Sequence, residues 1–521
     1  MPAGIYKLTT YIAQMIKILN NKPILKASFA VGLITLSTRL LGYIEKVILA
    51  FYFGTGYQVD VYTIIISIVT AVFIFIREVI EPGFLNVFLK RLNDKDGKSA
   101  WALFNKIARL IIFSTIFISI IAFVFPHIVI DLFAPGFKGE KREMTVKIIQ
   151  SAFPATVFLS LSALTNITLN GLKRFGLPAL GDFAFKAVIL LCLLILFKYT
   201  GIYSIIYGLI LGAFIKILIH SAGLYRNYSL KKINLDSGYA LDTWNLTWPL
   251  LIGVTFSQIS GLVDNIFASY MQEGALSALS YSKKIIDLPV LLFPYILSTV
   301  VFPYFSELAI AKEKGKLSVL FLKSIYCIVI VFLPLSVFFY MFSYEIIEII
   351  FKRGAFNEFS TMLTAKPFAV YSLGMTFFAL ETVLVIFYYS NSNTKTPIFI
   401  GVLCVIENII LTYFLIDKLG YLGIALALVI SKVTKIVILS LLVRKSLIAD
   451  YHDVMVFIFK VIFSTVVFGV VISLSKHFLE APAFTLSKKI TSVAVAFLIG
   501  TISYMLLLFL LRLKIAKSPK S

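Results

Sequence analysis

Long apolar segments follow one another along almost the whole of this chain, and they constrain its fold more than any other feature. A transmembrane helix needs about 20 mainly apolar residues. Segments of at least that length lie at about 28–54, 59–89, 101–133, 143–171, 177–198, 201–225, 240–271, 275–310, 317–351, 359–390, 396–416, 420–443, 452–479 and 488–512. The sequence therefore predicts an all-α polytopic membrane protein with about fourteen transmembrane helices.

The composition agrees with this class, because 60% of the 521 residues are hydrophobic and only 14% are charged. A soluble fold could not bury that much apolar surface. The three cysteines, Cys192, Cys327 and Cys404, form no CxxC pair, and the four histidines are scattered. We therefore expect neither a disulfide framework nor a metal site.

Basic residues are more frequent on one side of the predicted helices than on the other. Placing the N-terminus inside assigns to the cytoplasm Lys90, Arg91, Lys173, Arg174, Lys312, Lys314, Lys316 and the tail "RLKIAKSPKS". The segments "GTGYQVD" and "MQEG" on the other side carry no Lys or Arg. The positive-inside rule then predicts that both termini are cytoplasmic, with residues 1–27 as an amphipathic segment on that leaflet. The net charge of +22 reflects membrane anchoring, so we expect no nucleic-acid partner.

A weak internal repeat appears when the chain is aligned with itself at an offset of about 219 residues. Gly42 falls on Gly261, Glu45 on Asp264, Pro178 on Pro397 and Gly201 on Gly420. Six helices separate the two copies, so both enter the membrane from the same side, as in a parallel repeat. This predicts an N-lobe over 28–232, a C-lobe over 233–446, and two further helices with a cytoplasmic tail over 447–521. The alternative is chance similarity among apolar helices.

Charged residues concentrate in the first two predicted helices of each repeat. Each charge near the centre of a bilayer costs about 2.5–3.5 kcal/mol, so these residues need a reason. They are Arg39, Glu45, Lys46, Asp60, Arg77, Glu81, Asp264, Lys283, Lys284 and Asp287. A water-filled cavity lined by cations and a few carboxylates would suit an anionic substrate such as a phosphate or pyrophosphate. The alternative is internal salt bridges that fix helix packing, and for Glu45 and Lys46 both interpretations stay open.

A second group of polar residues lies in the predicted helix 396–416. Glu407, Asn408 and Thr412, together with Asp264, would supply the oxygen ligands that a small cation such as Na⁺ prefers. Buried structural hydrogen bonding is the alternative. Four further lysines lie nearer helix ends, where we expect them to snorkel to the interface: Lys186, Lys216, Lys432 and Lys435.

Six segments in one order resemble the motifs of the MurJ/MviN family of lipid II flippases. They are "TRLLGYIEK", "GTGYQVDVY", "REVIEPGF", "LFAPGF", "YSKKIIDLP" and "SNSNTKTP". The family belongs to the multidrug/oligosaccharidyl-lipid/polysaccharide exporter superfamily. The chain departs from the family pattern at Glu45-Lys46, where Arg-Asp is usual, and at Lys283-Lys284, where Asp-Arg is usual.

The resemblance implies two six-helix lobes, a central cavity, and a groove on the last two helices for a lipid tail. It implies translocation of lipid II for cell-wall synthesis, with no catalytic residues and no cofactor beyond coupling to Na⁺ or to the membrane potential. Arg39, Arg77 and Lys284 would bind pyrophosphate, with Lys46 and Lys283 as further cations. Asp60, Glu81, Asp287 and Glu45 would balance these charges or gate the cavity.

The same resemblance implies a multi-pass protein of the bacterial inner membrane, with lipid II and membrane lipids as ligands and cell-wall synthesis proteins as candidate partners. Rival functions are an O-antigen or polysaccharide-unit flippase and a cation-coupled drug exporter, whose cavity would be more apolar or acidic. A membrane glycosyltransferase would need catalytic groups on a sizeable outer loop, and the outer segments here are short. A non-catalytic scaffold would not need so many intramembrane charges.

Overall fold

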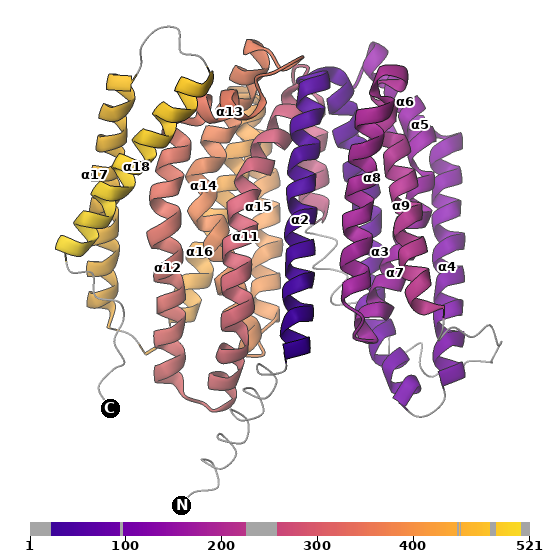
Figure 1. The fold of residues 1–521 in the computed structure, drawn as a ribbon, viewed down its shortest axis with the longest axis horizontal. Helices are drawn as coiled ribbons and strands as arrows, with labels where there is room; N and C mark the ends of the chain where they lie inside the picture. Colours follow the sequence, from indigo (N-terminus) through magenta and orange to yellow (C-terminus); the bar gives the residue numbers. More distant parts are fainter. Residues whose placement is uncertain are drawn as a thin grey trace, which may run out of the picture. The chain divides into compact units, whose positions relative to one another are not determined.

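The computed structural model describes residues 22–93, 97–225, 258–444, 447–448, 450–479 and 486–511. These residues are almost entirely helical and contain no β-strand (Figure 1). Helices satisfy their backbone hydrogen bonds internally, which apolar segments in lipid require. The all-α prediction is confirmed.

The chain divides into two compact units, which we describe separately. Unit 1 comprises Met1–Lys46, Ile65–Ile130 and Arg142–Val254, and unit 2 comprises Val47–Ile64, Asp131–Lys141 and Thr255–Ser521. The lobe boundaries predicted at 232/233 and 446/447 lie at residues outside the described ranges and stay predictions.

Unit 1 is built from helices whose apolar faces pack on one another. They are α2 (Lys22–Phe53) and α3 (Tyr57–Asn93), which both continue into unit 2, and then α4 (Gly97–Val124), α5 (Pro126–Phe133), α6 (Gly139–Ala152), α7 (Pro154–Gly171), α8 (Gly176–Thr200) and α9 (Tyr203–Leu224). Its aromatic core joins α3, α4 and α7 through Phe88, Trp101 and Leu164, all at most 3% exposed.

The described residues of unit 2 after 257 form a helix over 258–269 and eight further helices. They are α11 (Ala275–Ile310), α12 (Lys314–Met341), α13 (Ser343–Phe351), α14 (Glu358–Ser390), α15 (Lys395–Leu419), α16 (Tyr421–Arg444), α17 (Tyr451–Leu479) and α18 (Leu486–Leu510). Helix α14 packs on α11, α12 and α16, so it forms the centre of this unit.

Ten helices of the described residues are long and apolar enough to cross a membrane, or eleven if α6 and α7, bent by 45°, form one span. The chain is a multi-pass membrane protein. Two predicted spans, 101–133 and 317–351, are each a long helix followed by a short one, α5 or α13. Pro126 opens α5 at the first helical position, where its missing N–H costs nothing.

The predicted repeat is visible in the paired hairpins α8–α9 and α15–α16. Gly201 and Gly420 end the first helix of each pair with φ of 56° and 57°, a conformation that favours glycine. Their N–H groups donate to Phe197 and Ile416 at 2.9 and 2.8 Å. Two hairpins 219 residues apart therefore turn in the same way.

The "LFAPGF" and "IFKRGAF" segments also adopt related conformations, after α5 and after α13. The Phe137 N–H donates to the Ala134 carbonyl at 3.0 Å, and the Phe356 N–H donates to Arg353 at 3.1 Å. Both phenylalanines are buried. A Cβ at Gly354, which has a φ of 60°, would lie 2.3 Å from the Phe51 carbonyl oxygen, so only glycine fits there.

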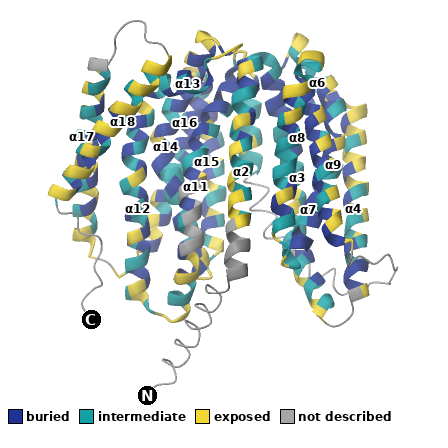
Figure 2. Cartoon of the chain, in the orientation of Figure 1, coloured by how far each residue is buried: buried dark blue, intermediate teal, exposed yellow. Residues whose placement is uncertain are grey.

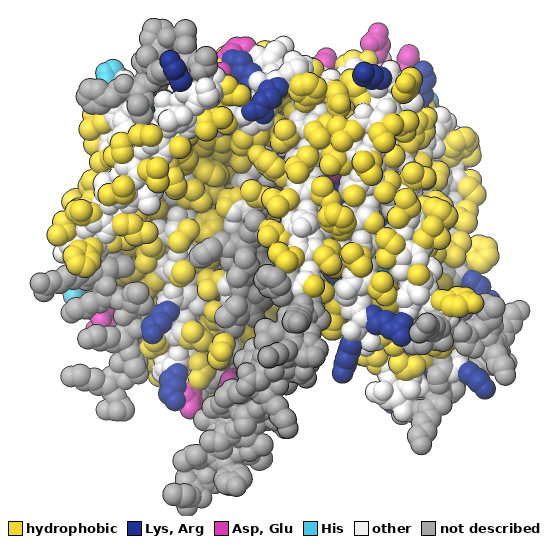
Figure 3. Space-filling view, viewed as in Figure 1, with side chains coloured by type: hydrophobic (Ala, Val, Ile, Leu, Met, Phe, Trp, Pro, Cys, Tyr) yellow, Lys and Arg dark blue, Asp and Glu magenta, His cyan; other side chains and the backbone are white. Residues whose placement is uncertain are grey.

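The surfaces of the helices suit a lipid environment. Large hydrophobic side chains are exposed along the outer faces of α4, α17 and α18 (Figure 2). On the face that Figure 3 shows, hydrophobic side chains cover the middle of the helices, and most charged side chains lie toward their ends. Soluble monomers rarely expose so much contiguous apolar surface.

Several predictions fall outside the described residues. They concern residues 1–21 of the amphipathic segment, residues 240–257 of the seventh predicted helix, and residues 512–521 of the tail.

Candidate functional site

A cavity of about 410 Å³ lies within unit 1, among α2, α3, α7, α8 and α9. Four cationic side chains line it: Arg39, Arg77, Lys186 and Lys216. Asp182 is the single carboxylate among the described residues of its lining. An intramembrane cavity with this balance is suited to an anionic ligand.

Arg39 and Arg77 lie in this lining as the sequence predicts. Arg77 Nε lies 3.5 Å from Glu81 Oε2, one helical turn away, and both side chains are nearly half exposed. An exposed pair at this distance contributes little to stability, so Arg77 remains available to a ligand. The roles predicted for Arg77 and Glu81 toward a ligand stay predictions.

Glu45 is a buried structural partner. Its side chain is 3% exposed, and its Oε2 accepts a hydrogen bond from Lys186 Nζ at 2.7 Å. The contact joins α2 to α8 and settles the open interpretation of Glu45 in favour of an internal salt bridge. The snorkelling predicted for Lys186 is wrong, because a buried carboxylate holds its ammonium group at the cavity.

Lys216 is a second correction of the same kind. Its side chain is 5% exposed, and its Nζ lies 2.6 Å from Asp182 Oδ1. The same ammonium lies 5.3 Å from the centroid of the Phe73 ring. Position along the helix suggested an interfacial lysine, but the packing of α8 against α9 turns the side chain inward.

The other predicted cations lie elsewhere. Lys46 is half-buried on α2 and does not line the unit 1 cavity. Lys283 is exposed on α11, and its neighbour Lys284 is half-buried, as is Asp287 one turn after Lys283. These three residues belong to unit 2, and their predicted roles stay predictions.

Asp60 forms a compact network in unit 2 and lies outside the lining of the unit 1 cavity. Its carboxylate accepts hydrogen bonds from the N–H groups of Gly274 and Ser277 at 2.9 and 2.8 Å, and from the Ser277 hydroxyl at 2.5 Å. Lys141 Nζ lies 2.6 Å from Oδ2. Asp60 therefore ties the start of α3 to the start of α11, and a carboxylate with several charge-assisted hydrogen bonds is a strong anchor.

The predicted cation site is assembled in part. Asn408 Nδ2 donates to Asp264 Oδ1 at 2.9 Å, while Asn408 Oδ1 and Thr412 Oγ1 are buried without a hydrogen-bond partner. Glu407 points elsewhere and accepts a hydrogen bond from Thr434 at 2.8 Å. No group of three or more His, Cys, Asp or Glu suited to a metal occurs among the described residues. Three oxygen-bearing side chains therefore remain for a hard cation such as Na⁺.

A half-buried ion-pair cluster on α14 and α16 was missed by the sequence reasoning. Glu381 accepts hydrogen bonds from Lys432 Nζ at 2.7 Å and from Lys435 Nζ at 2.5 Å. The snorkelling predicted for both lysines is wrong. A single glutamate in an apolar helix, opposite two lysines one turn apart, was the available sequence signal.

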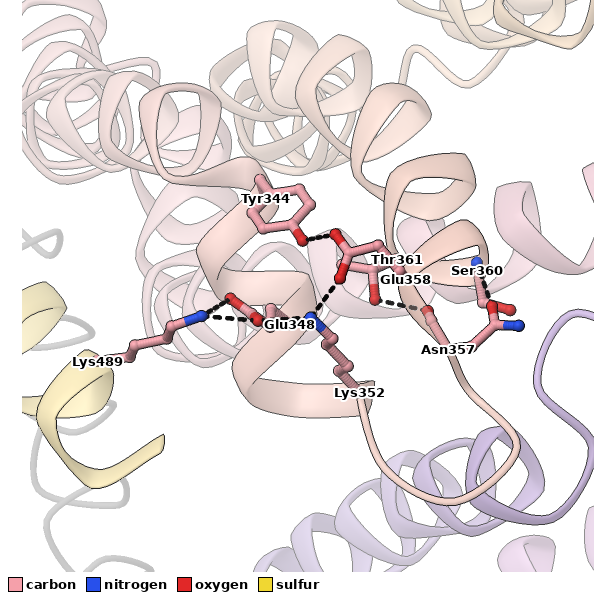
Figure 4. Close-up of polar contacts among 8 residues, drawn as sticks. All are labelled: Tyr344, Glu348, Lys352, Asn357, Glu358, Ser360, Thr361 and Lys489. Carbon is pink, nitrogen blue, oxygen red and sulfur yellow. Dashed lines mark hydrogen bonds and ion pairs between the residues drawn. The ribbon is translucent and has the colours of Figure 1, made fainter. Parts of the chain in front are cut away.

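A second cluster that the sequence reasoning missed lies at the short helix α13, which is not one of the candidate spans (Figure 4). Lys489 of α18 donates to both carboxylate oxygens of Glu348, at 2.8 and 2.9 Å, and Lys352 donates to Glu348 at 2.9 Å. Lys352 and Tyr344 also contact Glu358 at the start of α14. Glu348 therefore joins α13 to α18.

The electrostatics of this cluster follow from its contacts. Burial acts to raise the pKa of Glu348, but the hydrogen bonds from Lys489 and Lys352 outweigh it and leave the pKa below its usual value. The hydrogen bonds to Glu358 and Glu348 raise the pKa of the Lys352 ammonium group. Burial and the contact with Glu358 raise the pKa of Tyr344 to about 12.

An apolar groove lies on α17, lined by His452, Met455, Phe459, Phe463 and Leu511, with a volume of about 530 Å³. It lies on the last two helices, where the family resemblance implies a groove for a lipid tail.

The comparisons with known proteins agree with this architecture. The family model described as lipid II flippase MurJ matches residues 49–494, most of the chain. The chain belongs to the MurJ family. The family resemblance is thereby confirmed.

Relatives cover most of the chain at low identity. A protein of Buchnera aphidicola subsp. Schizaphis graminum named "Probable lipid II flippase MurJ" is 26% identical over 411 residues, which are 78% of this chain and 80% of the relative. A protein of Thermotoga maritima with the same name is 27% identical over 454 residues, 86% of this chain and 90% of the relative.

Solved structures show the same fold. "Lipid II flippase MurJ, inward closed conformation" superposes with a TM-score of 0.78 at 23% identity, covering 92% of this chain and 98% of that one. An inward-facing MATE transporter of the MOP superfamily superposes with a TM-score of 0.68 at 13% identity, covering 79% and 94%. The family fold is therefore present, and it fits the predicted class of about fourteen transmembrane helices.

Proposed function

We propose that this chain moves lipid II from the inner to the outer leaflet of the cytoplasmic membrane by alternating access, for cell-wall synthesis. The observation that carries this proposal is a cavity lined by four cationic side chains in a chain of the MurJ family. Such a lining would repel the cationic substrate of a drug exporter. It would attract the diphosphate of a lipid-linked precursor.

In this proposal the pyrophosphate is held by side chains that the cavity presents. Arg39 and Arg77 bind it, and Glu81 orients Arg77 until the cargo arrives. The sequence pattern assigns Lys284 as a further cation for the pyrophosphate, with Lys46, Lys283 and Asp287 in supporting roles. The lipid tail stays in the membrane and follows the apolar groove on α17.

Asp60 acts on the conformational change and not on the cargo. Its network joins α3 to α11, so opening that end of unit 2 requires four hydrogen bonds and ion pairs to be exchanged for water. Asp60 is therefore proposed as a gating residue.

The membrane potential contributes to the driving force. Each charge that crosses the membrane changes the free energy by about 2.3 kcal/mol per 100 mV. With a negative interior, outward movement of the anionic headgroup is favoured where the cavity does not neutralise it fully. Equal flipping in polarised and depolarised vesicles would exclude this coupling.

A cation such as Na⁺ is the proposed co-substrate of unit 2. Asp264, Asn408 and Thr412 would hold it, since two of their buried oxygen atoms have no protein partner. Bound Na⁺ would supply a positive charge that compensates Asp264.

The proposed location is the bacterial inner membrane with both termini cytoplasmic. Lipid II and membrane lipids are the proposed ligands, and cell-wall synthesis proteins are the proposed partners. Transport requires no covalent step and therefore no catalytic residue.

The decisive experiment measures lipid II on the outer leaflet of cells depleted of their own flippase. An externally added enzyme that cleaves the headgroup reports exposure, with wild type or Arg39→Ala expressed. Restored cleavage with wild type alone supports both the cargo and the cavity. Failure of well-expressed wild type points to a polysaccharide-unit flippase, and equal rescue by Arg39→Ala returns Arg39 to a structural role.

A further inference from the structure

The Asp182–Lys216 pair differs from the neighbouring Glu45–Lys186 pair in which partner is buried. In the Glu45–Lys186 pair the Glu45 side chain is 3% exposed and the Lys186 side chain is 30% exposed. In the Asp182–Lys216 pair the Lys216 side chain is 5% exposed and the Asp182 side chain is 47% exposed. The first pair buries its anion and opens its cation to the cavity, whereas the second buries its cation under an anion that can leave.

Helix packing holds Lys216 at the cavity wall. Beside it, a Cβ at Gly181 would lie 2.4 Å from His220 Nε2 and 3.2 Å from Lys216 Cγ, so α8 and α9 are in close contact. The rings of Phe73 and Phe185 lie 5.3 and 6.0 Å from the ammonium group. Lys216 therefore stays in place if Asp182 turns toward the open cavity.

A buried ammonium group needs an anion, because removing a charge from water is costly. Asp182 supplies that anion in the absence of cargo. A phosphate oxygen would serve equally well, since phosphate accepts charge-assisted hydrogen bonds from lysine. The exchange adds one cation to the cavity lining and requires only a side-chain rotation of Asp182.

We propose that Lys216 is an anion-binding residue of this cavity and that Asp182 is its built-in counter-anion, which a phosphate group of the cargo displaces. The inference rests on the proposed function, because the cargo is taken to carry a diphosphate. The displaced carboxylate remains close to the bound phosphate and repels it, which favours release at the end of the cycle. The group that Lys216 recognises is a phosphate, which a lipid-linked cargo and a free anion both carry.

The test measures binding of three probes to the purified full chain in detergent: farnesyl diphosphate, inorganic pyrophosphate and farnesol. Asp182→Asn frees Lys216, so we expect its Kd for farnesyl diphosphate to fall about tenfold, with no change for farnesol. An equal gain for pyrophosphate assigns the site to free anions as well, whereas a gain for farnesyl diphosphate alone assigns it to lipid-linked ones. Unchanged or weaker binding of both phosphate probes overturns the proposal.

A second variant keeps the proposal testable if Asp182→Asn does not fold. Lys216→Gln leaves only a half-exposed carboxylate without its partner, which water can solvate. We expect farnesyl diphosphate to bind about fivefold more weakly to this variant. Unchanged affinity would show that Lys216 does not contact the phosphate.

The matched control is Glu313→Gln in unit 2, which removes the carboxylate from an exposed Lys–Glu pair outside this cavity. We expect its Kd for farnesyl diphosphate to stay within about twofold of wild type. If Glu313→Gln tightens binding as much as Asp182→Asn does, added positive charge alone explains the effect and the proposal fails.

The lipid II assay separates this inference from the proposed function. If wild type moves lipid II but both variants bind the phosphate probes as wild type does, the counter-anion role of Asp182 is excluded and the flippase function stands. If wild type moves no lipid II but Asp182→Asn binds the phosphate probes more tightly, the anion site stands and the cargo is a different one.

Discussion

The α8–α9 hairpin of unit 1 and the α15–α16 hairpin of unit 2 turn at equivalent glycines and carry equivalent lysines. Lys216 and Lys435 are 219 residues apart, the same offset that relates Gly201 to Gly420. Lys216 pairs with Asp182, whose side chain is 47% exposed, whereas Lys435 pairs with Glu381, whose side chain is 19% exposed. Glu381 also binds Lys432, so two cations share one carboxylate.

The difference shows how one repeat can serve two purposes. In unit 1 the partner of the repeat-equivalent lysine, Lys216, lies on the adjacent helix of the hairpin and lines a cavity. In unit 2 the partner comes from α14, the central helix, and the pair is part of the packing. The lysine of unit 1 therefore lines a cavity beside an exposed carboxylate, whereas the lysine of unit 2 pairs with a carboxylate that the central helix largely covers.

A third Lys–Glu contact extends the comparison to a helix that is not a candidate span. Glu348 of α13 binds Lys489 in the first turn of the candidate span α18. Three similar pairs therefore occupy three environments, and their sensitivity to mutation and pH should differ accordingly.

The largest effect on stability is expected at the Glu381 ion pairs, because they join α14 to α16 at the centre of unit 2. Glu381→Leu leaves Lys432 and Lys435 without their carboxylate, which should lower the free energy of unfolding by about 3–5 kcal/mol. Thermal unfolding in detergent measures this, with Asp182→Leu as the comparison. A larger loss for Asp182→Leu would reverse the assignment of the two pairs.

The next effect concerns the equivalent turns. Gly201→Ala and Gly420→Ala place a side chain at φ of 56° and 57°, which should cost about 1–3 kcal/mol each. The two costs should agree, because an added Cβ would meet nothing within 4 Å at either glycine. Unfolding curves that differ widely between the two variants would show that the hairpins are not equivalent.

Substitution of an arginine in the unit 1 cavity should change the free energy of unfolding little but should slow transport clearly. Arg77→Ala should lower lipid II flipping by about tenfold, equivalent to about 1.4 kcal/mol, and leave stability nearly unchanged because its pair with Glu81 is exposed. Reconstituted vesicles measure the rate. Lys316→Ala, which removes an exposed cation outside the cavity, is the control and should transport normally.

The smallest effect is expected at α13, and it depends on pH. The pKa of Glu348 is lowered in the folded protein, so its contribution is present above its ordinary value of 4.5 and is lost as the pH falls through the folded pKa. We expect a loss of about 1 kcal/mol in the α13–α18 contact under acid conditions.

Hydrogen exchange at residues 486–490, corrected for the intrinsic rate, measures that contact at pH 7 and pH 4. Lys489→Gln removes one partner and should abolish most of the pH dependence. Equal protection in wild type at both pH values would show that the ion pair does not hold α18.

The sequence predicted helices well and ion pairs poorly. Apolar length and the flanking turns located all the spans that the structure describes, and the offset of 219 residues placed Gly201 and Gly420 in matching turns. Arg77 and Glu81 are in contact because they lie one helical turn apart, a spacing that is visible in the sequence. The partners of Lys186, Lys216 and Lys435 lie on other helices and were not found.

Apolar length and glycine positions by themselves determined that this chain forms membrane-spanning helices in two related halves. They act through local backbone sterics and through the transfer of side chains into lipid, which neighbouring helices scarcely alter. Only the tertiary structure decided which charges meet, because a carboxylate and an ammonium group far apart in sequence are paired by helix rotation and crossing. Glu45 with Lys186, and Asp182 with Lys216, therefore became a salt bridge and a proposed ligand site through packing alone.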